Sequence, residues 1–179
     1  MNIHPLFVHF PIGLLVVYSL LEICAYFWPA LRRQAWLFGV EAFLLFTGVL
    51  AAFVALITGG IAEDIIRHTN SYAFILKVHS PIAVLTTILY LILATAYLIR
   101  MFDTNGWGNR TVGLNRPFIR IWNFKKYVTY LILDTWLLPV LALLALLGMI
   151  VTGALGAAIV YGPNADPFVS FIYHLFWVQ

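Results

Sequence analysis

Two histidines occupy equivalent positions in two similar segments of the chain. His9 lies in residues 8–15, VHFPIGLL, and His79 lies in residues 78–85, VHSPIAVL. Each histidine opens a long apolar run and is followed two positions later by a proline. Neutral imidazole is a common ligand of haem iron, and the bond to the metal offsets the cost of burying the ring. The pair therefore predicts one b-type haem whose iron is bound by His9 and His79 as its two axial ligands.

Small and basic residues near this pair could complete a haem site. A flat macrocycle needs space beside each imidazole, and glycines in neighbouring helices allow a close approach to the backbone. Cations at the same membrane face could pair with the propionates. The remaining predicted cofactor-binding residues are Gly13, Ala83, Gly59, Gly153, Arg67 and Lys77. His-x-Pro near a helix start is also typical of an interfacial cap, so a structural role stays open.

Two other histidines are secondary candidates for the same chemistry. His4 precedes His9 by five residues, which places it on a different helix face. It could be a cap or a further ligand, and a cap is favoured. His174 lies in the terminal segment, where it is either a surface residue or part of a second cofactor site.

Three acidic residues form a second group that could do chemistry. Glu22, Glu41 and Asp134 each lie about two helical turns inside one end of an apolar segment. Carboxylates at similar depth on three helices could take up protons or hold a hard cation. They could instead pair with nearby basic side chains that extend inward. Glu22 and Glu41 are expected to lie closest together, because their segments form one hairpin.

The composition identifies the kind of protein that positions these residues. Of the 179 residues, 63% are hydrophobic and 9% are charged, and the mean hydropathy is +0.97. Soluble domains are about 45–50% apolar and about 25% charged. We therefore predict an integral membrane protein surrounded by lipid. The few Lys and Arg residues form no stripe for nucleic acid, and the single Cys24 permits no internal disulfide.

Four apolar segments are long enough to cross a bilayer, which requires about 20 residues each. They span approximately residues 6–28, 35–62, 72–101 and 127–161. A short terminal segment follows Asp166, and an apolar face made of Phe168, Phe171, Ile172 and Leu175 suggests that it lies in the membrane interface. The predicted fold is an all-α four-helix transmembrane bundle, residues 1–162, with a C-terminal interfacial aromatic segment, residues 163–179.

The distribution of basic residues predicts the topology. Eight of the ten Lys and Arg residues lie in or beside the first and third connections. The positive-inside rule places these connections in the cytoplasm and both termini outside. The chain also contains a weak internal repeat. The two histidine motifs resemble each other, and TGGIA at 58–62 resembles TGALG at 152–156. Two tandem helical hairpins related by an axis along the membrane normal would bring His9 and His79 to equal depth.

The opening residues also carry a family resemblance. IHPL at residues 3–6 followed by VHFPIG at 8–13 resembles the start of a family of small bacterial membrane proteins, catalogued as domain of unknown function 2231. A histidine that opens the third span and the AAIVYG stretch at 157–162 are also similar to it. The resemblance implies a bacterial cytoplasmic membrane, with His4, His9 and His79 as matching candidates. Because members occur fused to Rieske or cytochrome c modules, it also implies electron transfer at the outer face.

These observations favour a membrane b-type haem electron-transfer subunit with bis-histidine ligation near the outer face. Its partners would be other membrane subunits or an outer-face redox protein of cytochrome c or Rieske type. Two alternatives stay open: a cofactor-free accessory subunit of a respiratory or photosynthetic complex, and a proton- or ion-coupled carrier. No nucleotide loop, Ser-His-Asp order, CxxC or HExxH motif is present. The sequence leaves open whether the chain serves an oxidoreductase complex.

Overall fold

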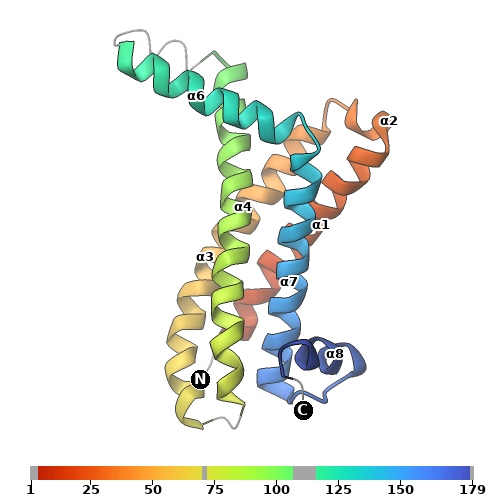
Figure 1. The fold of residues 1–179 in the computed structure, drawn as a ribbon, viewed down its shortest axis with the longest axis vertical. Coiled ribbons are helices and arrows are strands. Elements are labelled where there is room, and N and C mark those ends of the chain that lie inside the picture. Colours follow the sequence, from red (N-terminus) through yellow and green to blue (C-terminus); the bar gives the residue numbers. More distant parts are fainter. Residues whose placement is uncertain (1–3, 70–71, 107–115, 178–179) are drawn as a thin grey trace.

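The computed structural model of the protein describes residues 4–69, 72–106 and 116–177, and all regular structure in these ranges is helical (Figure 1). The elements in chain order are α1 (His4–Phe27), α2 (Pro29–Arg32), α3 (Leu37–Thr69), η1 (Ala73–Ile75), α4 (Leu76–Thr104), α6 (Arg116–Leu133), α7 (Leu137–Tyr161) and α8 (Pro167–Phe176).

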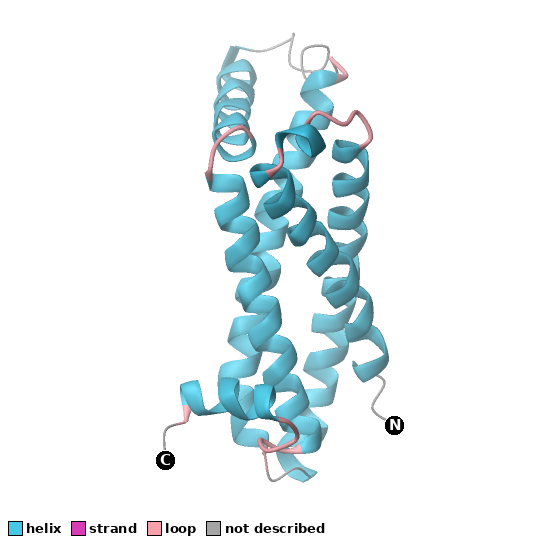
Figure 2. Cartoon of the chain, turned by 90° about the vertical axis from the view of Figure 1, so that its right-hand side faces the viewer, coloured by secondary structure: helices cyan, strands magenta, loops and turns pink. Residues whose placement is uncertain are grey.

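Four of these helices are long and apolar enough to cross a membrane. The candidate spans are Leu6–Phe27, Leu37–His68, Ala73–Thr104 and Leu137–Tyr161. They run side by side along the long axis of the molecule (Figures 1 and 2). Many large apolar side chains point outward from them, as expected for helices surrounded by lipid. The predicted all-α, four-span fold is confirmed.

The four spans form two hairpins that close into a ring. α1 packs most extensively on α3, and α4 packs most extensively on α7. Contacts of α1 with α7 and of α3 with α4 join the two pairs. Each hairpin therefore contributes two walls to the interior of the bundle, which is where helical proteins usually build their sites.

The predicted fourth span, residues 127–161, is wrong at its beginning. The helix ends at Leu133, the chain turns through 134–136, and α7 begins at Leu137. The Thr135 hydroxyl accepts the N–H of Leu137 at 3.2 Å, which provides a local start for α7. Residues from 127 to 133 belong instead to α6, an amphipathic helix that also contains Lys125 and Lys126 and lies across one end of the bundle (Figure 1).

The short terminal helix α8 is confirmed, with a different division of its faces. The Asp166 carboxylate accepts the N–H groups of Phe168 and Val169 at 2.8 and 2.9 Å, so it is the N-cap. Val169 and Ile172 are buried among residues of α7 and η1. Ile172 therefore does not belong with the exposed apolar side chains of α8, which are Phe168, Phe171, Leu175 and Phe176.

The two ends of the bundle differ in what they contain. α8, the two termini and the connection between α3 and α4 lie at one end, while α2 and α6 lie at the other (Figure 1). We call the first the histidine end and the second the carboxylate end. Three fully buried tyrosines, Tyr18, Tyr90 and Tyr97, belong to the core cluster in the half of the bundle nearer the carboxylate end.

Candidate functional site

A cavity of about 500 Å³ lies among the four spans at the histidine end. Its volume is within the range of roughly 300–1,000 Å³ typical of small-molecule sites. Helices α1, α3, α4 and α7 all contribute to its lining, which is mostly apolar. The polar side chains in the lining include His4, His9, Glu63, His79 and Thr152. We call this space the histidine cavity.

The His4 ring is held against α3. Its Nδ1 lies 3.1 Å from the Thr58 hydroxyl, whose own proton is directed to the carbonyls of Val54 and Ala55 at 3.0 and 3.1 Å. With that proton engaged, the hydroxyl is assigned as the acceptor and Nδ1–H as the donor, which corresponds to one imidazole tautomer. A Cβ at Gly59 would lie 3.1 Å from Cε1 of His4, so glycine lets the ring rest on the helix. Burial lowers the pKa of His4, partly opposed by a hydrogen bond to Ala55.

The His79 ring lies against α7 in a similar way. A Cβ at Gly156 would lie 3.4 Å from Cε1 of His79. The ring also has a hydrogen-bond contact with the backbone of Thr152, one helical turn before that glycine. Its Nδ1 is buried and has no hydrogen-bond partner among the described residues. A buried polar atom of this kind costs free energy unless something satisfies it.

The geometry relates His79 to His4 more closely than to His9. The His4 ring rests on Gly59 and contacts the backbone of Ala55, four residues before that glycine. The His79 ring rests on Gly156 and contacts the backbone of Thr152, again four residues before the glycine. His9 lines the same cavity but is exposed. The VHxP motif singled out His9 and His79. The matching contacts on α3 and α7 add His4 to them.

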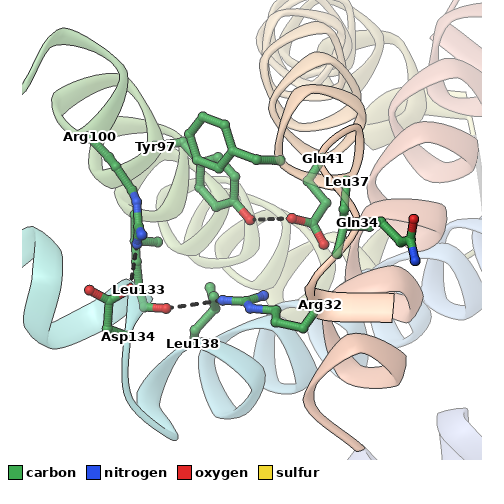
Figure 3. A pocket seen from close by; sticks show the side chains of 10 residues that line it. Arg32, Gln34, Leu37, Glu41, Tyr97, Arg100, Leu133, Asp134 and Leu138 are labelled. Atoms are coloured by element: carbon green, nitrogen blue, oxygen red, sulfur yellow. Dashed lines mark hydrogen bonds and ion pairs between the residues drawn. The ribbon is translucent and has the colours of Figure 1, made fainter. Parts of the chain in front are cut away.

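At the carboxylate end, two carboxylates meet around one tyrosine. Glu22 and Glu41 are 1% and 2% exposed. The Tyr97 hydroxyl lies within hydrogen-bonding distance of the Glu22 carboxylate. It is also 2.9 Å from Oε2 of Glu41, a contact shown in Figure 3. Arg32 donates to Glu22 at 2.7 Å and to the Leu133 carbonyl at 3.1 Å. The structure thus brings Glu22 and Glu41 together, as the hairpin arrangement suggested.

Asp134 lies apart from these two carboxylates. It forms an ion pair of 2.5 Å with Arg100, and both side chains are partly exposed. Asp134, Arg100 and Glu41 line a pocket of about 270 Å³ at this end of the bundle (Figure 3). The alternative in which a carboxylate pairs with a basic side chain of the adjacent connection is seen for Glu22, whose partner is Arg32. Asp134 pairs instead with Arg100 of α4.

A comparison with protein families decides the identity of the chain. The family model described as "Predicted membrane protein (DUF2231)" matches residues 1–165. The chain belongs to the DUF2231 family. Comparisons with curated proteins and with solved structures gave no match. The family match ends just before α8.

In this DUF2231 chain, the opening segment that carried the family resemblance lies at the histidine cavity. His4 and His9 belong to this segment, and both line the cavity together with His79. Three of the small residues predicted from the sequence also line it: Gly59, Gly153 and Ala83. A Cβ at Gly153 would meet no heavy atom within 4 Å, so this glycine borders open space.

Other predicted site residues lie outside this lining. Gly13 is exposed and is not among the lining residues. Arg67 is 57% exposed and forms an ion pair with Glu63, and Lys77 is also exposed. His174 is exposed on α8, with Nδ1 3.4 Å from the Trp177 carbonyl.

Sequence reasoning missed Glu63 and Thr152 as lining residues. Glu63 accepts a hydrogen bond from Ser80 at 3.3 Å, which links α3 to the residue that follows His79. The similarity of TGGIA and TGALG marked the right part of α7 without identifying Thr152 itself. Within the described ranges, no three His, Cys, Asp or Glu side chains gather closely enough to hold a metal ion. A haem requires one or two axial side chains.

Proposed function

We propose that the protein is a membrane electron-transfer subunit that holds one b-type haem in the histidine cavity. The observation that carries the proposal is the His79 ring, whose buried Nδ1 has no hydrogen-bond partner among the described residues and which lines a cavity shared with two further histidines. Ligation of a metal is one way to satisfy such a ring, because neutral imidazole offers a lone pair.

The lining fits a macrocycle in size and in character. The cavity of about 500 Å³ is mostly apolar and lies between the two hairpins. Gly153 borders open space, while Gly59 and Gly156 let imidazole rings rest directly on α3 and α7. Bound haem would supply one-electron redox chemistry. The residues of the chain would bind it, orient the ligands and exclude water.

His79 and His4 are the ligand pair that the contacts favour. The Thr58 hydroxyl accepts from Nδ1–H of His4, and such a hydrogen bond fixes the ring and raises the basicity of the other nitrogen. His9 is the second ligand that the sequence motif predicts, and it lines the same cavity. The two possibilities differ in which variant, His4→Ala or His9→Ala, loses the haem.

The charge distribution supports an orientation with the histidine end outside. The described basic residues of the first and third connections, among them Arg32, Arg33, Arg120 and Lys125, lie on or beside α2 and α6 at the opposite end. The positive-inside rule would place that end in the cytoplasm of a bacterium. A cytochrome c or Rieske partner, or another membrane subunit, would then exchange electrons near α8.

The proposal is tested by a dithionite-reduced minus oxidised absorption spectrum of protein expressed with added haem. We expect a sharp b-type α band in the wild type and complete loss of the band in His79→Ala. His68→Ala is the matched control, because His68 is exposed and lies outside the cavity lining. It should keep the band. A flat spectrum from intact wild-type protein would contradict haem binding and favour a cofactor-free accessory subunit.

A further inference from the structure

Tyr97 lies between two buried carboxylates and has one proton to share. Its hydroxyl is within hydrogen-bonding distance of Glu22 and 2.9 Å from Oε2 of Glu41. A hydroxyl can donate to one acceptor at a time. If Tyr97 donates to Glu22, its contact with Glu41 is a hydrogen bond only when Glu41 carries a proton and donates to the Tyr97 oxygen.

The charges around the cluster favour the same assignment. The ionisable groups that face it are Glu22 and Tyr18 from α1, Arg32 from α2, Glu41 from α3, Tyr97 and Arg100 from α4, and Asp134 from the turn before α7. Arg32 is paired with Glu22 at 2.7 Å and Arg100 is paired with Asp134 at 2.5 Å. An ionised Glu41 would therefore be a buried charge in excess, which is costly.

Glu41 also has an oxygen that the protein does not satisfy. Its Oε1 is buried and has no hydrogen-bond partner within the described ranges, although the side chain is only 2% exposed. The same side chain lines the pocket of about 270 Å³ at the carboxylate end (Figure 3). Gln34 and Asp134, which also line the pocket, are exposed, so the pocket reaches the surface. One water needs only about 10–15 Å³ of such space, so the pocket can hold several.

From this arrangement we propose that Glu41 is a proton-binding site, loaded from the surface pocket and linked to Glu22 through the Tyr97 hydroxyl. In the transfer, the Glu41 proton passes to the Tyr97 oxygen as the Tyr97 proton passes to Glu22. Tyr97 is unchanged, one carboxyl group is deprotonated and the other is protonated. The ligand is a proton, and the site is independent of haem at the other end of the bundle.

Infrared spectroscopy of the protein in liposomes tests this assignment. A protonated carboxyl group has a C=O stretching band that an ionised carboxylate lacks and that shifts in D₂O. We expect such a band at neutral pH in the wild type, a shift when D₂O replaces water, and loss of the band in Glu41→Gln. Glu63→Gln is the matched control, because Glu63 pairs with Arg67 at the histidine end. The band should persist in this control.

A second variant keeps the test informative if Glu41→Gln is not recovered. Tyr97→Phe retains both carboxylates and removes the hydroxyl that accepts from Glu41. The band should remain and move to higher frequency, because the carboxyl group has lost its hydrogen-bond acceptor. The absence of a wild-type band at every pH tested, or a band that is unaffected by both substitutions, would overturn the proposal. Neither result depends on whether the protein binds haem.

Discussion

The two ends of the bundle bury ionisable side chains between the same four helices, but they satisfy them differently. At the carboxylate end, Glu22 has Arg32 and Tyr97 as partners, and a stacked contact joins Tyr97 to Phe38. At the histidine end, the His79 ring borders a cavity of about 500 Å³, and its Nδ1 has no partner among the described residues. The carboxylate end thus provides Glu22 with a cation and a hydroxyl group, although Oε1 of Glu41 there has no partner among the described residues, whereas the histidine end provides the His79 Nδ1 with none.

The two ends differ in this way because the side chains that fill the interior differ in size. Tyr18, Tyr90 and Tyr97 are fully buried and fill the interior in the half nearer the carboxylate end. At the histidine end, α3 and α7 present glycines to the interior, including Gly59 and Gly153. Large side chains bring polar groups into contact with one another, whereas glycines leave room for something else. This difference agrees with the two proposals, a ligand site at the histidine end and a proton site at the carboxylate end.

The largest expected contrast concerns the two arginine–glutamate pairs. Arg32→Ala would leave the Glu22 carboxylate, 1% exposed, without its cation. Because the Arg32 side chain is itself 40% exposed, we expect a loss of about 2 kcal/mol in the free energy of unfolding, less than for a fully buried pair. Arg67→Ala removes a pair whose arginine is 57% exposed, and we expect a loss below about 1 kcal/mol. Denaturation of both variants in the same detergent measures the difference.

Arg32→Lys serves as the control for this contrast. It retains the positive charge near Glu22 but cannot also reach the Leu133 carbonyl with a second guanidinium nitrogen. It should recover part of the stability lost in Arg32→Ala. Equal losses for Arg32→Ala and Arg67→Ala would mean that the carboxylate end is no better satisfied than the surface, and the comparison would fail.

The helical fold was predictable because lipid imposes a strong constraint on sequence. Four long apolar runs can only be spanning helices, and all four are present. The break at 134–136 was missed, because a continuous apolar pattern from Tyr127 onward does not reveal where a helix turns out of the bundle. That turn depends on the Thr135 contact with Leu137. It also depends on the basic side chains of α6, which are more stable at the end of the bundle than among the apolar spans.

Two glycines provide the next contrast, between a closed helix crossing and the cavity. A Cβ at Gly48 would lie 2.5 Å from Cδ2 of Leu15, a fully buried residue, so Gly48→Ala should cost about 2 kcal/mol through overpacking. A Cβ at Gly153 meets nothing within 4 Å, and Gly153→Ala should change stability by less than about 0.5 kcal/mol. The same denaturation measurement compares them. A large loss for Gly153→Ala would show that the space beside this glycine is not open.

A larger substitution at Gly153 connects this contrast to the proposed function. Gly153→Leu should fill part of the cavity and reduce the haem α band while leaving the helical content unchanged. Gly13→Leu is the matched control, since a Cβ at Gly13 also meets nothing within 4 Å but the residue lies outside the cavity lining. Equal haem content in the two variants would place the haem outside this cavity.

The candidate site was only partly predictable, because motifs report similarity along the chain and not contacts across it. The VHxP motif singled out His9 and His79, and both line the cavity, but Gly13, which was expected to make room beside His9, is exposed and lies outside the lining. The role of His4 depends on Thr58 and Gly59, which lie more than fifty residues away and approach it only through the packing of α1 on α3. Spacing alone carries no information about that packing.

The smallest expected effect is a pH dependence of stability at the histidine end. Burial lowers the pKa of His4 from its usual 6.5, so the folded protein binds this proton less tightly than the unfolded chain does. The contribution of His4 to stability is therefore fully present above pH 6.5 and is lost as the pH falls below it. Because the ring is only half-buried, the loss should stay below about 1 kcal/mol.

Denaturation of haem-free protein between pH 7 and pH 5 measures this effect. His4→Gln should weaken the fall in stability, whereas His68→Gln should not, because the His68 ring is exposed and its Nδ1 lies 2.7 Å from the Asp64 carbonyl of its own helix. If both variants follow the wild type, the neutral His4 ring does not contribute to the packing of α1 on α3. The link between Thr58, Gly59 and the ring would then be too weak to position an iron ligand, and His9 would become the stronger candidate for the second axial position.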